Sequence, residues 1–177
     1  MMTLEDLLLE KKTAITAKWL EKTLATYSQD ASVFFKKVKN QFANPVGQTL
    51  SSGLEAIYKT LLEKMDAEKL CSHLEEVIKV RSVQDFTPSR AVVFIFMLKE
   101  AIREILKDEL KDQKVLSQLA EFELKIDQLA LFAFDLFVKT REKMYELRVN
   151  EVKRQVSTLM KRSGYFVGDS EQDTDHQ

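Results

Sequence analysis

The residues best suited to binding chemistry lie in a polar turn at positions 81 to 90. Two arginines, three hydroxyls, an amide and a carboxylate fall within these ten residues, and an uncharged apolar run follows from Ala91. Pro88 suits the first turn of a helix, whose free backbone amides attract anions. The sequence therefore suggests a small polar ligand pocket, formed by Arg81, Gln84, Asp85, Thr87, Ser89 and Arg90.

The same turn also has a purely structural interpretation, which we favour. Arg81 and Asp85 are one helical turn apart and can form an ion pair. Thr87 and Ser89 can cap the helix that begins at Pro88. Both interpretations use the same side chains, so the ligand pocket remains a hypothesis.

The chain offers little for catalysis or metal binding. It has two histidines and one cysteine, and His176 lies in the polar C-terminal tail. His73 stands at the edge of an apolar helical stripe near Cys71, and a lone histidine there is a poor basis for haem ligation. The sequence contains no glycine-rich phosphate loop, zinc-ligand spacing or Ser-His-Asp set. We expect a non-enzymatic protein without a cofactor, in which Cys71 is an inert, half-buried residue.

Composition limits the fold. Of 177 residues, 45% are hydrophobic and 31% charged, while only four are glycine and two are proline. Such a chain can form one helical domain with a sizeable core and has few residues for turns. The net charge of -1 gives no general attraction to nucleic acid or anionic lipid. Acidic residues interrupt any N-terminal signal pattern, so we expect a cytoplasmic, all-α protein without membrane insertion.

Apolar spacing and capping residues predict six helical segments. Gly53 lies beside the apolar stripe of the third, where its missing side chain would allow another helix to approach closely. The fifth begins with an uncharged apolar run to Leu98, so we expect its first turns to be covered on every side. The expected helices cover residues 4–26, 33–42, 45–61, 67–81, 88–110 and 115–163, with caps at Thr3 and Asp6, Ser32, Asn44, Asp66, Thr87 and Asp112.

The last segment combines two apolar patterns. Residues 129–138 are apolar on all sides except at Asp135, which can pair with Lys139 or act as a polar specificity residue in a dimer interface. Further on, apolar residues recur at the 4-3-4-3 spacing of a short coiled coil. The predicted dimer or partner interface comprises Leu131, Phe134, Asp135, Val138, Tyr145, Val149, Val152, Val156 and Leu159.

The second half of this segment is basic. Residues 139–162 carry eight basic and three acidic side chains, a local net charge of +5. Nucleic-acid-binding segments usually interleave such charges with aromatic residues or carry a recognisable motif, and this one does neither. We therefore expect a solvated or protein-binding helix that does not contact nucleic acid.

The polar turn also resembles the signature of a known family, the RsbRD-type N-terminal domain of RsbR-like stressosome co-antagonists. Trp19 in the first helix matches as well, and the resemblance covers about Leu4 to Leu136. The matching runs are Val80-Arg81-Ser82-Val83-Gln84-Asp85-Phe86-Thr87-Pro88-Ser89-Arg90-Ala91, then Phe94-Ile95-Phe96-Met97-Leu98-Lys99, and Asn44-Pro45-Val46-Gly47.

The resemblance implies a globin-like, all-helical sensor domain that is usually dimeric and lacks haem. In RsbR-like proteins the last helix leads into a STAS domain that carries phosphorylated threonines. The present sequence ends at Gln177 without such a domain, so no kinase target is carried over and we expect a stand-alone sensor.

These observations predict a globin-like helical bundle with a long, projecting C-terminal helix. Residues 1–138 would form the sensor-like domain, 139–163 a helical extension and 164–177 a disordered polar tail. The leading hypothesis is a homodimeric regulatory protein in stress or sigma-factor regulation that relays a signal to a separate STAS-domain protein or switch kinase. The alternative is a scaffold that docks onto an enzyme or redox complex, and a haem-based sensor is the third class.

Overall fold

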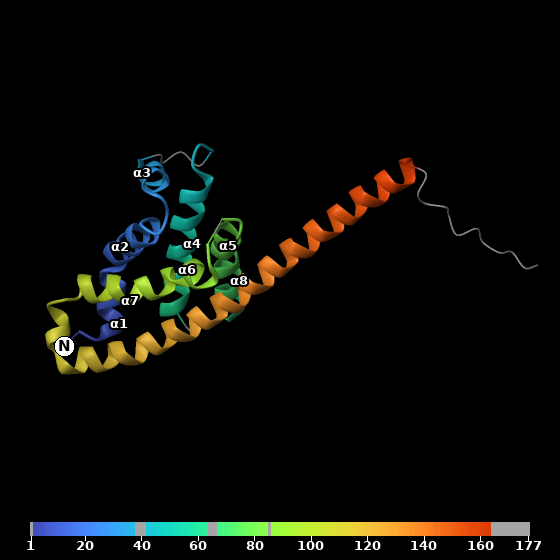
Figure 1. Ribbon diagram of the computed structural model, residues 1–177. Helices are drawn as coiled ribbons and strands as arrows, with labels where there is room; N and C mark the ends of the chain where they lie inside the picture. The colour runs from blue at the N-terminus through green and yellow to red at the C-terminus, as the bar shows by residue number, and fades with distance from the viewer. Residues whose placement is uncertain (1, 38–41, 64–66, 85, 164–177) are drawn as a thin grey trace, which may run out of the picture. The chain divides into compact units, whose positions relative to one another are not determined.

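The computed structural model describes residues 2–37, 42–63, 67–84 and 86–163, and every regular element among them is helical (Figure 1). The all-α fold is therefore confirmed, whereas the expected cap at Asp66 and the C-terminal tail lie outside the described residues. The elements are α1 (Leu4–Glu10), α2 (Lys12–Leu24), α3 (Gln29–Lys37), α4 (Pro45–Leu62), α5 (Ala67–Ser82), α6 (Pro88–Val92), α7 (Phe94–Ile105), the 3-10 turn η1 (Glu109–Lys111) and α8 (Gln113–Arg162).

The chain divides into two compact units, one ending at Arg141 and the other beginning at Glu142. The first holds α1 to α7 and the first part of α8, and it contains the hydrophobic core. Helix α4 packs extensively on α5, and α2 packs extensively on α7. Fully buried side chains in this core include Trp19, Leu50, Ile57, Tyr58, Leu74 and Phe94. No described helix has both the length and the apolar character needed to cross a membrane.

Gly53 permits the close packing of α4 on α5. A Cβ atom at this position would lie 2.5 Å from Cγ2 of Val77, a fully buried side chain of α5. That distance is well below a carbon–carbon van der Waals contact of about 3.5–4.0 Å. The predicted close approach of a second helix at Gly53 is therefore confirmed.

Three of the predicted caps are present. Thr3 and Asp6 form the capping box of α1, and the Asn44 side chain accepts a hydrogen bond from the Gly47 amide at the start of α4. Asp112 Oδ1 accepts from the Lys114 amide at 2.8 Å, at the start of α8. Short-range capping patterns thus predicted these helix starts correctly.

Two other predicted caps are wrong. Helix α3 begins at Gln29, before the expected cap at Ser32, and the Ser28 hydroxyl accepts a hydrogen bond from the Ala31 amide instead. Thr87 precedes α6 as expected, but its side chain makes no capping hydrogen bond. Its hydroxyl lies 3.4 Å from that of Ser89.

The first predicted helix is divided at Lys11, which has a φ of -94° and a ψ of 13°. The Leu8 carbonyl, which would serve the Lys12 amide in a continuous helix, accepts a hydrogen bond from the Tyr58 hydroxyl at 2.9 Å. A side chain 50 positions away in the sequence thus satisfies the acceptor that the break exposes. The expectation of one helix over residues 4–26 is wrong for this reason.

Candidate functional site

The polar turn predicted as a ligand pocket is organised around a buried arginine. Arg81 extends the buried stripe of α5 and is 0% exposed. Its Nε donates to the Ala91 carbonyl at 2.7 Å. Its Nη2 donates to the Arg90 carbonyl at 3.0 Å and to the Thr26 hydroxyl at 3.2 Å. The guanidinium therefore joins α5 to α6 and to the end of α2.

Aromatic rings surround the same guanidinium. Its carbon lies 5.2 Å from the ring centre of Tyr27, 4.7 Å from that of Phe86 and 5.2 Å from that of Phe94. Ring faces carry partial negative charge and attract cations at such distances. Burial nevertheless lowers the pKa of Arg81, and it raises the pKa of Tyr27. Among the described residues, Arg81 Nη1 and the Tyr27 hydroxyl are buried without a hydrogen-bond partner.

Arg81 also explains why the central helix is divided. In a continuous helix the carbonyls of Arg90 and Ala91 would accept from the backbone amides four residues later. Here both accept from the Arg81 guanidinium, and the chain turns at Val93 between α6 and α7. The prediction of one helix over residues 88–110 is therefore wrong. So is the expectation that the start of this segment is covered on every side, because Phe96 is 42% exposed.

The other residues of the predicted pocket lie differently. Gln84 is half-buried, while Thr87, Ser89 and Arg90 are exposed. Arg90 donates to the Thr26 carbonyl at 3.1 Å and stacks over the Phe86 ring at 5.4 Å. The structure thus gathers the two arginines around Thr26 and Phe86, while the exposed Thr87 and Ser89 hydroxyls lie 3.4 Å from each other. Asp85, the expected ion-pair partner of Arg81, lies outside the described residues.

The end of α5 is also tied to α8. Arg141 Nη1 donates to the Ser82 carbonyl at 3.0 Å, and the Arg141 guanidinium lies 6.0 Å from the Phe137 ring centre. Ser82 follows Arg81 directly, so adjacent residues of α5 contact α6 on one side and α8 on the other. Through this hydrogen bond the polar turn is in direct contact with α8.

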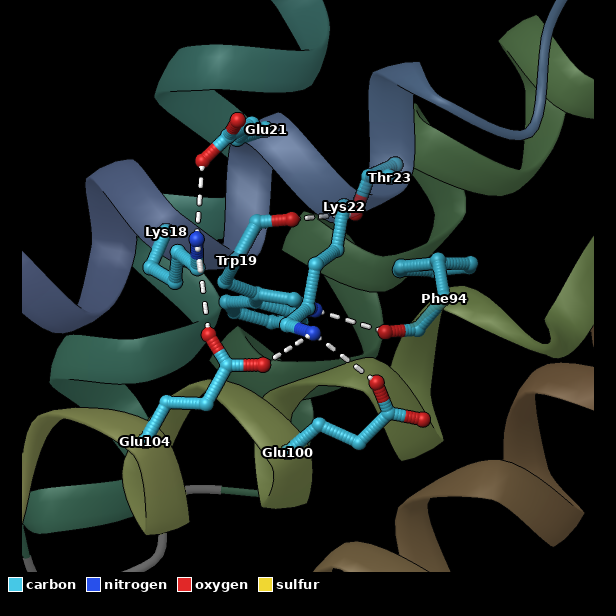
Figure 2. A network of polar contacts seen from close by, with 8 residues as sticks. All are labelled: Lys18, Trp19, Glu21, Lys22, Thr23, Phe94, Glu100 and Glu104. Carbon is cyan, nitrogen blue, oxygen red and sulfur yellow. Dashed lines mark hydrogen bonds and ion pairs between the residues drawn. The ribbon is translucent and has the colours of Figure 1, made fainter. Parts of the chain in front are cut away.

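An ion-pair network joins α2 to α7 (Figure 2). Lys22 Nζ lies 3.0 Å from a carboxylate oxygen of Glu100 and 2.6 Å from one of Glu104. Lys18 reaches Glu104 at 3.4 Å and Glu21 at 3.2 Å. No helical spacing rule predicts the pairs between α2 and α7, because Lys22 and its two glutamate partners are about 80 residues apart in the sequence.

We expect this network to make stability depend on pH. The hydrogen bond from Lys22 holds the pKa of Glu104 below its usual 4.5, so the folded state gains stability above pH 4.5 and loses it as the pH falls through the lowered pKa. Urea unfolding should show the native protein to be more stable than Glu104→Gln at pH 7, and this difference should shrink as the pH falls below 4.5 and through the lowered pKa. Glu121→Gln, on an exposed glutamate of α8 with no ion pair to a described residue, is the control and should show no such change with pH. If the difference in unfolding free energy between the native protein and Glu104→Gln were the same at every pH, the ion pair of Glu104 would not be the source of the pH dependence.

The predicted interface residues of the first unit are mostly exposed. Leu131 is 70% and Phe134 43% exposed, and Asp135 also faces solvent, whereas Val138 is half-buried. Asp135 and Lys139 form no ion pair in the part of the chain that the structure describes, so this first of the two alternatives for Asp135 is wrong. In the second unit the predicted residues Tyr145, Val149, Val152, Val156 and Leu159 are all exposed or nearly so.

A longer repeat runs through α8 than sequence analysis recognised. Apolar residues recur at a strict interval of seven over six positions, beginning at Leu124, which is itself 63% exposed. One apolar residue every seven positions lies along one side of the helix, but the second apolar position of a coiled-coil heptad is present only at Val149 and Val156. Counting back from the predicted segment would have revealed it. The six residues are Leu124, Leu131, Val138, Tyr145, Val152 and Leu159.

The candidate metal ligands do not cluster. His73 and Cys71 are both half-buried on α5. Within the described ranges, no group of three or more histidine, cysteine, aspartate or glutamate side chains could hold a metal ion. The polar turn and the exposed face of α8 therefore remain the candidate functional regions.

Comparison with known proteins agrees with the resemblance drawn from the polar turn. Searches of curated proteins and of solved structures give no match. The model of the family described as "RsbT co-antagonist protein rsbRD N-terminal domain" matches residues 13–152, which include the polar turn, the buried arginine and most of α8. The chain therefore belongs to this family of regulatory domains.

Proposed function

We propose that this protein is a non-enzymatic sensor domain that forms a homodimer through the seven-residue repeat of α8. It passes a signal along α8 to an output protein of the STAS-domain or switch-kinase class. Family membership supports the regulatory role. The observation that carries the dimer is the exposure of large apolar side chains along α8, from Leu131 at 70% to Leu159 at 64%, because exposed apolar groups of this kind mark an interaction site or an aggregation hazard.

The contacts around α8 support the relay. Arg81 and Ser82 connect the polar turn to α6 and to Arg141 on α8. A change in the polar turn would alter the position of Arg81, and the neighbouring Ser82 carbonyl would transmit that change to α8. The same helix carries the repeat, so self-association and signal output are expected to be coupled.

Leu131→Glu is expected to abolish the dimer. The glutamate would place a charge at the second position of the repeat, where an apolar side chain that is 70% exposed in the single chain becomes buried in the dimer. Sedimentation equilibrium should show dimers for the native protein and monomers for Leu131→Glu at the same concentration.

Leu9→Glu is the matched control for this experiment. Leu9 is a 55% exposed leucine on α1, outside the repeat, so its replacement adds the same charge and should leave the dimer intact. A native protein that sediments as a monomer would refute the dimer. Co-purification of the native protein and Leu131→Glu with candidate STAS-domain or switch-kinase proteins then tests the output, and recovery of an enzyme complex instead would favour a scaffold.

A further inference from the structure

A small apolar pocket lies between α5 and α8 in the first unit. Its volume is about 120 Å³, and its walls include Leu70, Leu74, Leu129 and Phe132. Leu74 and Leu129 are buried at its base, while Phe132 is 57% exposed. The lining also contains Cys71, the one cysteine of the chain. None of these residues takes part in the polar turn or the seven-residue repeat.

The size and lining of the pocket limit what it can hold. An engineered protein cavity of about 150 Å³, lined by apolar side chains, stays dry and binds benzene. A 120 Å³ pocket thus suits an apolar group of about five or six carbon atoms. Water has few hydrogen-bonding partners in this pocket. Transfer of an apolar group from solvent into it is therefore favourable in free energy.

The charge at the rim adds a second requirement. Lys125 lines the pocket and is exposed, and it forms no ion pair with any described residue. It also lines a more open, polar hollow of about 320 Å³ on its other side, next to Leu8 and Phe122. An occupant of the apolar pocket can therefore leave its polar end in solvent beside the Lys125 ammonium.

We propose that this pocket binds a small hydrophobic carboxylate, with its apolar part between α5 and α8 and its carboxylate paired with Lys125. The pocket accepts an aliphatic or aromatic group of about six carbons, as in hexanoate. The pocket contains no residue of the seven-residue repeat or the polar turn, so a failure of the proposed dimer or relay would leave this proposal standing. Glu121, one turn before Lys125, faces the polar hollow and disfavours a second carboxylate there.

Cys71 provides a direct readout of occupancy. As the sole cysteine, it can be alkylated with iodoacetamide in the full chain and the product followed by intact mass. Hexanoate should slow the alkylation with half-maximal effect on the order of 0.1–1 mM, as expected for a ligand of eight heavy atoms. Each methylene added from butanoate to hexanoate should tighten binding about fourfold, and longer chains should add little.

Variants separate the roles of charge and cavity. Lys125→Met should weaken protection by hexanoate about two- to fivefold and leave protection by hexan-1-ol unchanged. Lys114 is an exposed lysine of the same helix that does not line the pocket, so Lys114→Met should change protection by neither hexanoate nor hexan-1-ol. Leu70→Phe, at a buried wall residue of the pocket, should fill the space and remove protection, with far-UV circular dichroism confirming that the variant is folded.

Three results would overturn the proposal. The first is the absence of protection at a hexanoate concentration on the order of 10 mM, which is tenfold above the highest half-maximal concentration expected. The second is equal protection by hexylammonium, which would show that Lys125 does not select the charge. The third is protection without ligand that grows with protein concentration, because a second copy of the chain would then cover the pocket.

Discussion

Arg81→Met is expected to lower the free energy of unfolding by about 3 kcal/mol, which corresponds to a decrease of roughly 6–12 °C in Tm for a chain of this size. Methionine can keep much of the packing between the rings of Tyr27, Phe86 and Phe94, but it cannot donate hydrogen bonds. The buried carbonyls of Arg90 and Ala91 would lose their donors. An unpaired buried carbonyl costs about 1–3 kcal/mol.

Arg90→Met is the matched control for this prediction. Arg90 belongs to the same cluster but is exposed, and it makes one hydrogen bond to the Thr26 carbonyl. Its loss should cost less than about 1 kcal/mol. Thermal unfolding and urea titration of both variants test the difference. Equal losses would show that the Arg81 hydrogen bonds are not the source of stability.

The same pair of variants bears on the ligand-pocket hypothesis for the polar turn. If a small anion binds there, it should raise the Tm of the native protein and leave the Tm of Arg81→Met unchanged. The Tm difference between the two proteins would then increase when the anion is added. If Arg81 is structural only, no small anion changes the Tm difference between the two proteins. The buried position of Arg81 and its three hydrogen bonds favour the structural role.

Local patterns predicted the helices well where the deciding contacts are local. The start of α4 depends on Asn44 and Pro45, and the capping box of α1 on Thr3 and Asp6, all within one helical turn. Gly53 also allowed the close approach of a second helix to be predicted. A glycine beside an apolar helical stripe costs helix stability, and close packing of another helix is the usual compensation. These features can be recognised without any knowledge of tertiary structure.

The two divided helices could not be predicted in the same way. Both breaks expose backbone carbonyls, and both are stabilised by a donor side chain from another helix, Tyr58 in one case and Arg81 in the other. Helix propensity and apolar spacing are continuous across Lys11 and Val93, so nothing local marks either break. The donor becomes visible only when the helices are packed together.

The candidate site was predicted in part for similar reasons. The exposed face of α8 follows from spacing, because period-seven apolar residues must lie along one side of a helix. The polar turn was correctly singled out as unusual, but the sequence could not show that Arg81 points inward while Arg90 faces solvent. That difference depends on the rings of Tyr27, Phe86 and Phe94, which are far apart in the sequence and meet around Arg81 only in the folded chain.

Trp19→Ala is expected to be the most destabilising single change, at about 3–5 kcal/mol. Trp19 is fully buried on α2, and its ring stacks on Phe94 with centroids 6.3 Å apart and planes inclined by 16°. Its Nε1 donates to the Phe94 carbonyl at 2.6 Å (Figure 2). Trp19→Phe keeps an aromatic ring but loses this donor, so it should cost an intermediate amount, about 2 kcal/mol. Urea unfolding followed by circular dichroism measures both, because neither variant retains a tryptophan for fluorescence. A Trp19→Phe variant as stable as the native protein would show that the hydrogen bond to α7 contributes nothing and that packing alone holds α2 in place.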